Sequence, residues 1–250
     1  MTGLAMAERR VADPEATIIC VHGGLDRGGS FARLARRIER FDVVAYDRRG
    51  YQSSRDLQPS NLEGHVDDLV AIARLEGARR PVILFGHSFG GVVALGAAIA
   101  VPSLAQLVLL YESPLPWLMT RERSRPPLGD DPGAEAERFF NRMVSASAWE
   151  RLSESERESR RRDGPALLSD LRGLNNVQRP FEVSELTTPV IYLHGDGARR
   201  DYYRELCATL TRLSPHLRCR EIESSGHGAH LAQPDLLATV ITEEWDRVCA

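Results

Sequence analysis

The sequence predicts an α/β fold in which a mostly parallel central sheet carries helices on both faces. Short apolar runs alternate with helical segments along most of the chain, which is typical of a parallel sheet covered on both sides. The stretch 113–188 interrupts this alternation with clustered prolines, many charges and no convincing strand. We therefore expect a core of residues 1–112 and 189–250, with 113–188 inserted as a helical cap.

The expected strands are short runs of β-branched and aliphatic residues. TIICV at 17–21 and PVILF at 81–85 are almost wholly apolar and end in glycines. Such runs, too short for a helix and bounded by turn residues, are typical of strands buried on both faces. By this criterion, and by alternation for the last one, we expect strands at 17–21, 42–46, 81–85, 106–111, 189–193 and 217–223.

Helical segments fill the intervals between these strands. Ser30 can cap a helix over 30–40, and Asn61 can cap an amphipathic segment that Gly77 ends. The apolar segment 92–101 follows the third strand directly and predicts a fully buried helix. Further helices are expected at 199–213 and 235–248, and a solvated helix or mobile link at 152–162.

The composition excludes several classes of protein. The 250 residues are 42% hydrophobic and 27% charged, an ordinary mixture for a soluble globular domain. The formal net charge of -3 argues against a nucleic-acid partner, because such domains are strongly basic. The chain has neither an apolar run of about 18 residues nor a secretory signal. We expect a cytoplasmic protein with a small-molecule substrate and no membrane partner, and we predict no oligomeric state.

The cysteines predict neither a metal site nor a structural disulfide. They show no CxxC spacing, and one of them lies within an apolar run. In a reducing cytosol, free buried thiols are the expected state. We therefore expect no metal, no other cofactor and free thiols at Cys20, Cys207, Cys219 and Cys249.

The pentapeptide GHSFG at 86–90 gives the strongest chemical signal. It lies directly between an expected strand and an expected helix, which is the context that a G-x-S-x-G nucleophile elbow requires. At so tight a turn, a side chain at position 86 or 90 would collide with neighbouring backbone. The alternatives, a phosphate-binding loop or simple helix–sheet packing, are less consistent with this placement. We predict that Ser88 is a nucleophile.

A serine hydroxyl needs a base near neutral pH, and His227 in GHGAH at 226–230 is the best candidate. A loop after the last strand lies at the same carboxyl edge of the sheet as Ser88. The alternative is a histidine of a surface loop. We expect His230 to be structural or to line the pocket, and His87 to pack or hydrogen-bond beside the nucleophile.

The HGG segment at 22–24 follows the first expected strand and is suited to binding an oxyanion. Glycines there allow backbone N–H groups to approach a carbonyl closely. We assign this role to the N–H groups of Gly24 and Phe89, the latter at a helix N-terminus where the dipole favours negative charge. The alternative for HGG alone is a tight turn.

Together these segments resemble the α/β-hydrolase superfamily over about 16–245. The resemblance rests on VHGG, VVAYDRRGYQSS at 43–54, GHSFGG and GHGAHLAQP. In that family the catalytic histidine begins such a last stretch, and His227, His230 and Pro234 match its spacing. The resemblance implies a Ser-His-acid hydrolase with a helical cap, on a sheet that lacks at least one N-terminal edge strand. Gln52 stands where the family often has glycine, a change we expect to be minor.

The acid of the triad departs from the usual family position, which falls on Ala198 here. Some family members place the acid after the strand that corresponds to 106–111, and Glu112 occupies that place. We predict Glu112, with Asp196 and Asp201 as alternatives that lie near the usual turn but out of register. Glu112 can also be read as a strand-end residue that caps nearby backbone.

Apolar side chains of the cap favour a substrate with an apolar acyl or alcohol group. The alternative is that they form the core of the cap itself. Arg121, Arg123 and Arg125 can bind an anionic group or form a solvated cap edge. The predicted substrate contacts are the residues expected around the pocket: Leu25, His87, Trp117, Met119, Phe139 and His230.

The function that follows is hydrolysis of a small carboxylic ester, thioester or lactone through an acyl-enzyme on Ser88. The displaced acid leaves a second hypothesis, a small-molecule receptor on the same scaffold. A biosynthetic thioesterase or lyase is the third, because the fold alone does not choose between these activities.

Overall fold

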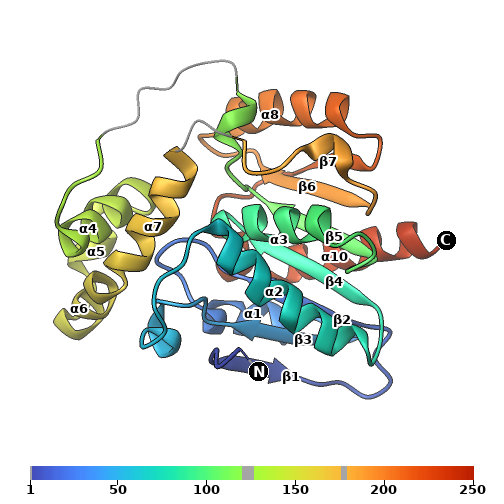
Figure 1. The fold of residues 1–250 in the computed structure, drawn as a ribbon, viewed down its shortest axis with the longest axis horizontal. Coiled ribbons are helices and arrows are strands. Elements are labelled where there is room, and N and C mark those ends of the chain that lie inside the picture. The colour runs from blue at the N-terminus through green and yellow to red at the C-terminus, as the bar shows by residue number, and fades with distance from the viewer. Residues whose placement is uncertain (1, 120–126, 176–178) are drawn as a thin grey trace.

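The computed structural model describes residues 2–119, 127–175 and 179–250. Within these ranges the centre is a seven-stranded sheet of order β1-β3-β2-β4-β5-β6-β7 (Figure 1). Strand β1 pairs with β3 in the antiparallel sense, and the other pairs are parallel. The predicted fold class is confirmed. The strands are β1 (Met6–Arg9), β2 (Ala16–Val21), β3 (Phe41–Tyr46), β4 (Val82–His87), β5 (Leu107–Tyr111), β6 (Val190–Gly195) and β7 (Leu217–Ile222).

Six of these strands coincide with expected ones, whereas β1 was not predicted. Its four residues, MAER, are mostly exposed, so they carry neither an apolar run nor an alternation that a sequence pattern would reveal. Pairing with β3 on the edge of the sheet, from Met6 opposite Tyr46 to Arg9 opposite Val43, makes this segment a strand.

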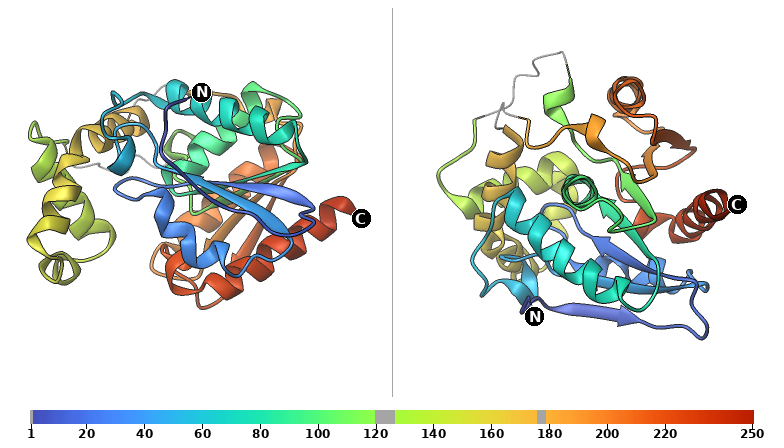
Figure 2. Two further views of the ribbon diagram at one scale, coloured as in Figure 1. Left: turned by 90° about the horizontal axis from the view of Figure 1, so that it is seen from below. Right: turned by 45° about the vertical axis from the view of Figure 1, so that its right-hand side comes forward.

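Helices cover both faces of the sheet. Helices α2 (Leu62–Gly77), α3 (Phe89–Ala100) and α8 (Arg200–Leu213) share one apolar cluster with the sheet. Helices α1 (Ala32–Ala35) and α10 (Pro234–Cys249) share the cluster on the opposite face (Figure 2). A short helix, α9 (Ala229–Ala232), precedes α10. This burial of two faces explains the nearly uninterrupted apolar strands.

Two helix predictions can be checked at their ends. The Asn61 side chain accepts a hydrogen bond from the Gly64 N–H at 3.0 Å and caps α2, which ends at Gly77 as expected. The single helix expected over 30–40 is instead a 3₁₀ turn, η1 (Gly28–Phe31), followed by the one-turn α1. Bonds of the 3₁₀ type, such as Arg37 N–H to Leu34 C=O at 2.9 Å, end the α-helical ladder there.

The insertion is helical where the structure describes it. Its main helices are α4 (Pro132–Met143), α5 (Ala146–Glu150), α6 (Glu154–Arg162) and α7 (Gly164–Asn175). They form a lobe beside the sheet, which we call the cap (Figure 1). Helix α6 has no buried residue and begins with a capping box of Ser153 and Glu156. The boundaries 113 and 188 stay a prediction. Two 3₁₀ turns flank the lobe, η3 (Pro116–Leu118) and η4 (Val183–Glu185).

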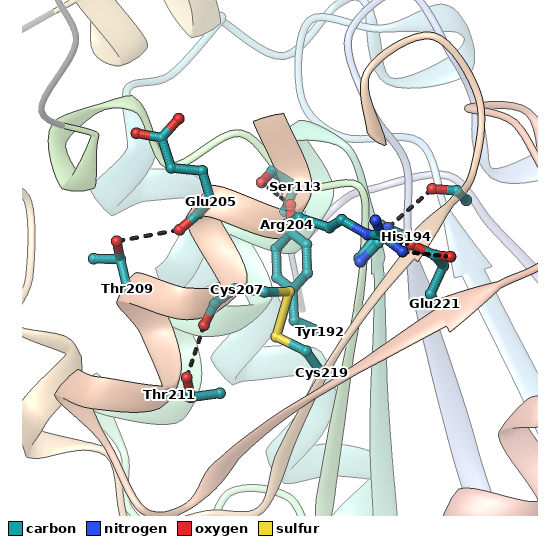
Figure 3. The surroundings of a disulfide bond; sticks show 11 residues. Ser113, Tyr192, His194, Arg204, Glu205, Cys207, Thr209, Thr211, Cys219 and Glu221 are labelled. Carbon is teal, nitrogen blue, oxygen red and sulfur yellow. Dashed lines mark hydrogen bonds and ion pairs between the residues drawn. A yellow bond between two sulfur atoms is a disulfide. The ribbon is translucent and has the colours of Figure 1, made fainter. Parts of the chain in front are cut away.

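The expectation of free thiols is wrong for two of the four cysteines. Cys207 of α8 and Cys219 of β7 form a disulfide, which lies beside Tyr192 of β6 (Figure 3). Helix α8 folds back along β7 and brings the two Cα atoms to 6.0 Å, within the range that a disulfide spans. Cys20 and Cys249 are free. The disulfide removes the support that free thiols gave to a reducing compartment, and the cytoplasmic location stays a prediction.

Every helix in the described part of the chain is too short or too polar to span a bilayer.

Candidate active site

Ser88 occupies a sharp turn between β4 and α3. Its backbone has φ 52° and ψ -124°, a left-handed conformation that costs a non-glycine residue energy. A Cβ at Gly86 would overlap the backbone of Gly91, and one at Gly90 would overlap the Val21 carbonyl. The two glycines of the pentapeptide are therefore required by close backbone approach. This is the geometry that a nucleophile elbow needs.

His227 and Glu112 are hydrogen-bonded. The Nδ1 atom of His227 lies 2.8 Å from a carboxylate oxygen of Glu112. Because a carboxylate accepts only, Nδ1 carries the hydrogen and Nε2 is left as the basic nitrogen. The other Glu112 oxygen accepts from the Gly195 N–H at 3.1 Å. Burial, followed by the charge of Glu112, raises the pKa of Tyr203, so this phenol stays protonated near neutral pH.

The two alternative acids lie elsewhere. Asp196 accepts hydrogen bonds from the backbone N–H groups of Ser224 at 3.0 Å and Ser225 at 3.1 Å. The bond from Ser224 is the largest of the causes that lower the pKa of Asp196. Asp201 is exposed in the first turn of α8. Among the three candidate acids, the hydrogen bond to His227 in the described structure comes from Glu112.

Ser88, His227 and Glu112 line one cavity of about 350 Å³ together with both predicted oxyanion residues, Gly24 and Phe89. The cavity lies where β2, β4 and β5 end, facing helices α4 and α7 of the cap and the start of α8. A Cβ at Gly23 would lie 2.9 Å from the Ser88 Cβ. The HGG loop at 22–24 thus approaches Ser88 closely, and Phe89 is the first residue of α3.

The cap makes much of the cavity wall apolar. Of the predicted substrate contacts, Met119 and Phe139 line the cavity. The apolar lining also includes residues that sequence reasoning did not single out: Pro114, Pro116, Leu128, Leu167, Leu171 and Leu174. Such a lining accommodates an apolar group.

The other predicted contacts do not lie on this cavity. Leu25 packs into the apolar cluster of the cap. Trp117 packs edge-on against Phe181, with ring centroids 5.6 Å apart. His87 and His230 lie against each other with ring centroids 4.4 Å apart and ring planes tilted by 47°. The predicted cationic residues Arg121, Arg123 and Arg125 fall outside the described residues.

Polar residues that the sequence did not single out stand on the cavity wall. Arg142 of α4 and Arg199, just before α8, bring two cations to it. The Arg142 guanidinium lies 5.6 Å from the centroid of the Phe139 ring. Tyr202 and Tyr203 contribute hydroxyl groups from α8. Arginines are common on helix surfaces, so no sequence pattern distinguished these two from the other arginines of the chain.

A buried ion pair joins the cap to the core beside the cavity. Arg48 follows β3, is fully buried and binds the Asp170 carboxylate of α7 through two nitrogens, at 3.1 and 2.7 Å. Tyr51 donates to the same carboxylate at 2.6 Å, and His65 Nε2 lies 3.3 Å from it. Although burial opposes it, the Arg48 charge helps to lower the pKa of Asp170. No pattern in the sequence predicts this pairing, because 122 positions separate the two residues.

The same arginine holds the oxyanion loop. Its Nε atom donates to the His22 carbonyl at 3.0 Å, and one Nη donates to the Gly23 carbonyl at 3.2 Å. The His22 Nε2 accepts from the Arg48 backbone N–H at 2.9 Å. Burial and then the Arg48 charge lower the pKa of His22 to about 4, so this ring stays neutral near pH 7. Arg48 therefore connects the cap, the oxyanion loop and β3.

Comparisons with known proteins agree with this architecture. The model of the alpha/beta hydrolase family matches residues 18–240. A pimeloyl-[acyl-carrier protein] methyl ester esterase of Stenotrophomonas maltophilia is 27% identical over 241 residues, which cover 90% of each chain. Lipase LipV of Mycobacterium tuberculosis is 35% identical over 96 residues, but these span 38% of this chain and 36% of the lipase.

Solved structures share the fold at low sequence identity. MenH from S. aureus superposes with a TM-score of 0.70 at 17% identity, over 98% of this chain and 99% of that one. A lipase-esterase related protein from Clostridium acetobutylicum superposes with a TM-score of 0.72 at 16% identity, over 96% and 98%. The sequence match spans most of the chain and the architecture agrees with it: the chain belongs to the alpha/beta hydrolase family.

Proposed function

We propose that the protein is a serine hydrolase that cleaves a small carboxylic ester, thioester or lactone through an acyl-enzyme on Ser88. At the coarser level, its full-length and partial relatives are named esterases and a lipase, and the chain is a hydrolase that acts on ester bonds. The observation that carries the finer proposal is the 2.8 Å contact between His227 Nδ1 and Glu112, on the cavity that Ser88 also lines.

The first half of the reaction forms the acyl-enzyme. His227 Nε2 takes the Ser88 proton as the Ser88 oxygen attacks the carbonyl carbon. The Gly24 and Phe89 N–H groups stabilise the oxyanion that develops. Glu112 keeps His227 in the required tautomer and stabilises the imidazolium. The tetrahedral adduct then collapses, and His227 gives its proton to the departing alcohol or thiol.

The second half regenerates the enzyme. A water molecule gives a proton to His227 Nε2 and attacks the acyl carbon. The same N–H groups stabilise the second oxyanion, and collapse releases the carboxylic acid while the proton returns to Ser88. No group other than Ser88, His227, Glu112 and the two backbone donors is needed for this cycle.

The cavity supports a substrate with an apolar acyl chain and an anionic end. The wall is apolar around Phe139 and Met119, and Arg142 and Arg199 stand on the same cavity. The esterase relatives are named for a methyl ester of a carrier-bound acyl chain. The complete set of Ser88, His227 and Glu112 offers no support to a receptor without turnover.

An active-site probe and an ester panel test the proposal. A fluorophosphonate should label Ser88 alone, as read by peptide mass spectrometry, and Ser88→Ala should abolish labelling. Ser88→Ala should also lower the hydrolysis rate of p-nitrophenyl esters by about 10⁴-fold or more. Acyl-thioester and lactone substrates in the same panel separate the esterase from the thioesterase. Folded protein that takes up no label and turns over none of these substrates would contradict the proposal.

A further inference from the structure

Three side chains that could ligate a metal meet behind the nucleophile elbow. They are Asp26, which follows the oxyanion loop, His87, which ends β4, and His230 in α9. The Asp26 Oδ2 lies 3.4 Å from His230 Nε2 and 3.8 Å from His87 Nδ1. One ligand atom from each residue lies within 4.8 Å of the other two. In the part of the chain that the structure describes, no other group of three or more histidine, cysteine, aspartate or glutamate side chains lies close enough to share a cation.

The two histidines are buried and have unused nitrogens. His87 is 6% exposed and His230 is 2% exposed. Neither His87 Nδ1 nor either ring nitrogen of His230 has a hydrogen-bond partner among the described residues. Buried polar atoms of this kind are uncommon in folded proteins, and a bound water or ion is one explanation.

The tautomer of His87 is set by its other nitrogen. The Nε2 atom lies 2.8 Å from the His227 carbonyl oxygen, which can only accept, so Nε2 carries the hydrogen. The Nδ1 lone pair is therefore free, and Nδ1 lies 3.8 Å from the Asp26 Oδ2. In metal sites, a backbone carbonyl often accepts a hydrogen bond from the other ring nitrogen of a metal-binding histidine and so orients the ring.

We propose that Asp26, His87 and His230 form a binding site for a divalent transition-metal cation of the zinc class, distinct from the hydrolytic site. Two imidazoles and one carboxylate are a ligand set that zinc accepts, with the fourth position left to water. A second cavity, of about 420 Å³, is lined by Asp26 but by neither histidine, so it reaches the cluster on the Asp26 side. Tetrahedral zinc places its ligand atoms about 3.3 Å apart, so binding requires a small contraction of the cluster.

Neighbouring groups limit the affinity. The Ser30 hydroxyl donates to Asp26 Oδ2 at 3.1 Å and competes for the same oxygen. The second cavity is also lined by Arg27, Arg33, Arg36 and Arg160, whose charges oppose a cation. We therefore expect a site weaker than a structural zinc site. A bound cation would contact Asp26, which follows the HGG loop, and His87 of the elbow. His87 is in turn hydrogen-bonded to the His227 carbonyl, so the cation would link these three segments.

Zinc titration tests this site without any measurement of turnover. Metal-free wild type should bind one Zn²⁺ per chain by calorimetry, and its Tm should rise with the zinc concentration because the cation binds the folded state. Co²⁺ should give the visible d–d absorption of a four- or five-coordinate ion. Asp26→Asn and His230→Gln should each weaken Zn²⁺ binding by about 100-fold or more. Removing a group that only orients a metal ligand already lowers metal affinity by about 10- to 100-fold.

A matched control and a folding check make the result decisive. His216→Gln, which removes a histidine outside the cluster, should bind Zn²⁺ like wild type. Far-UV circular dichroism and the zinc-free Tm should show that both cluster variants fold. The proposal is overturned if wild type binds no Zn²⁺ at millimolar concentration, or if a folded cluster variant binds it as tightly as wild type does.

Discussion

The central strands and the cap are attached to the rest of the molecule in different ways. Strands β2, β4 and β5 are buried along their whole length between two apolar clusters. The cap meets the core through directed polar contacts, such as Arg48 with Asp170 and Arg55 with Asp163. An apolar cluster also joins Leu25 and Tyr51 of the core to the cap, but it is much smaller than the two clusters of the sheet.

Because of this difference, we expect the sheet and the attachment of the cap to respond differently to amino-acid substitution. Apolar burial is non-directional and spread over many side chains, so the sheet tolerates conservative exchanges. Removing one partner of a buried ion pair leaves the other charge uncompensated, at a cost of about 3–5 kcal/mol. We therefore expect the position of the cap to depend on a few residues. The core supplies every candidate catalytic group, and the cap supplies much of the substrate-binding wall.

The largest effect should come from a core residue of the active site. Glu112→Gln keeps the shape of the side chain but removes the charge that stabilises the His227 imidazolium. We expect kcat to fall by about 10³- to 10⁴-fold, measured by steady-state hydrolysis of the best ester of the panel. The unfolding free energy should change little by comparison.

Two control variants sharpen this expectation. Asp196→Asn should keep kcat near the wild-type value, because Asp196 binds the Ser224 and Ser225 N–H groups instead. Phe139→Ala, in the cap, should raise KM more than it lowers kcat. If Asp196→Asn destroys turnover while Glu112→Gln does not, the assignment of the acid is wrong.

The next largest effect should come from the attachment of the cap. Arg48→Met removes the buried partner of Asp170, and we expect the unfolding free energy to fall by about 3–5 kcal/mol. The double variant Arg48→Met/Asp170→Leu, which removes both charges, should recover most of this loss. Urea denaturation followed by circular dichroism measures both. A double variant as unstable as Arg48→Met would mean that the ion pair is not the reason for the loss.

The free energy of unfolding should also depend on pH, in one pH range through the buried histidines of the core and in a lower range through Asp170 of the cap. His22 and His87 of the core have pKa values below the usual one. Below about pH 6.5 the unfolded chain gains protons that the folded protein does not. The free energy of unfolding therefore decreases as the pH is lowered through this range. Asp170 also has a lowered pKa, so its contribution is present above about pH 4 and is lost as the pH falls further.

Urea denaturation at a series of pH values measures these windows. The Arg48→Met/Asp170→Leu variant should still lose stability between about pH 6.5 and 4, because His22 and His87 stay buried, but less than wild type does, since the Arg48 charge also lowers the pKa of His22. Below that range it should lose less than wild type. An unfolding free energy of wild type that is constant from pH 8 to 4.5 would contradict the role of the buried histidines.

The smallest effects should come from two helix caps. Asn61→Ala, at the start of α2, should cost about 1 kcal/mol of unfolding free energy, because α2 is packed on the sheet. Ser153→Ala removes the equivalent cap of α6, which buries no residue, so we expect a smaller global change and faster amide exchange within α6. Equal global losses for the two variants would argue that the cap unfolds together with the core.

The candidate residues His227 and Glu112 show which features a local pattern predicts and which it does not. The spacing of His227 from His230 and Pro234 is visible along the chain, as is the elbow between a strand and a helix. The sequence also predicts Glu112 ahead of Asp196 and Asp201, but the contact of Glu112 with His227 depends on where the strands end in the sheet. Trp117, although close to Glu112 in sequence, packs against Phe181 and does not line the cavity.

By itself, the sequence determined the order of strands and helices, the elbow at Ser88, the HGG loop and the helical nature of the insertion. Each of these depends on residues within a few positions of one another, where periodicity and turn sterics act. The tertiary structure alone decided the edge strand β1, the disulfide, the Arg48–Asp170 pair and the residues that face the cavity. These arise when distant segments pack side by side, and their contacts depend on crossover and packing geometry that no local pattern encodes.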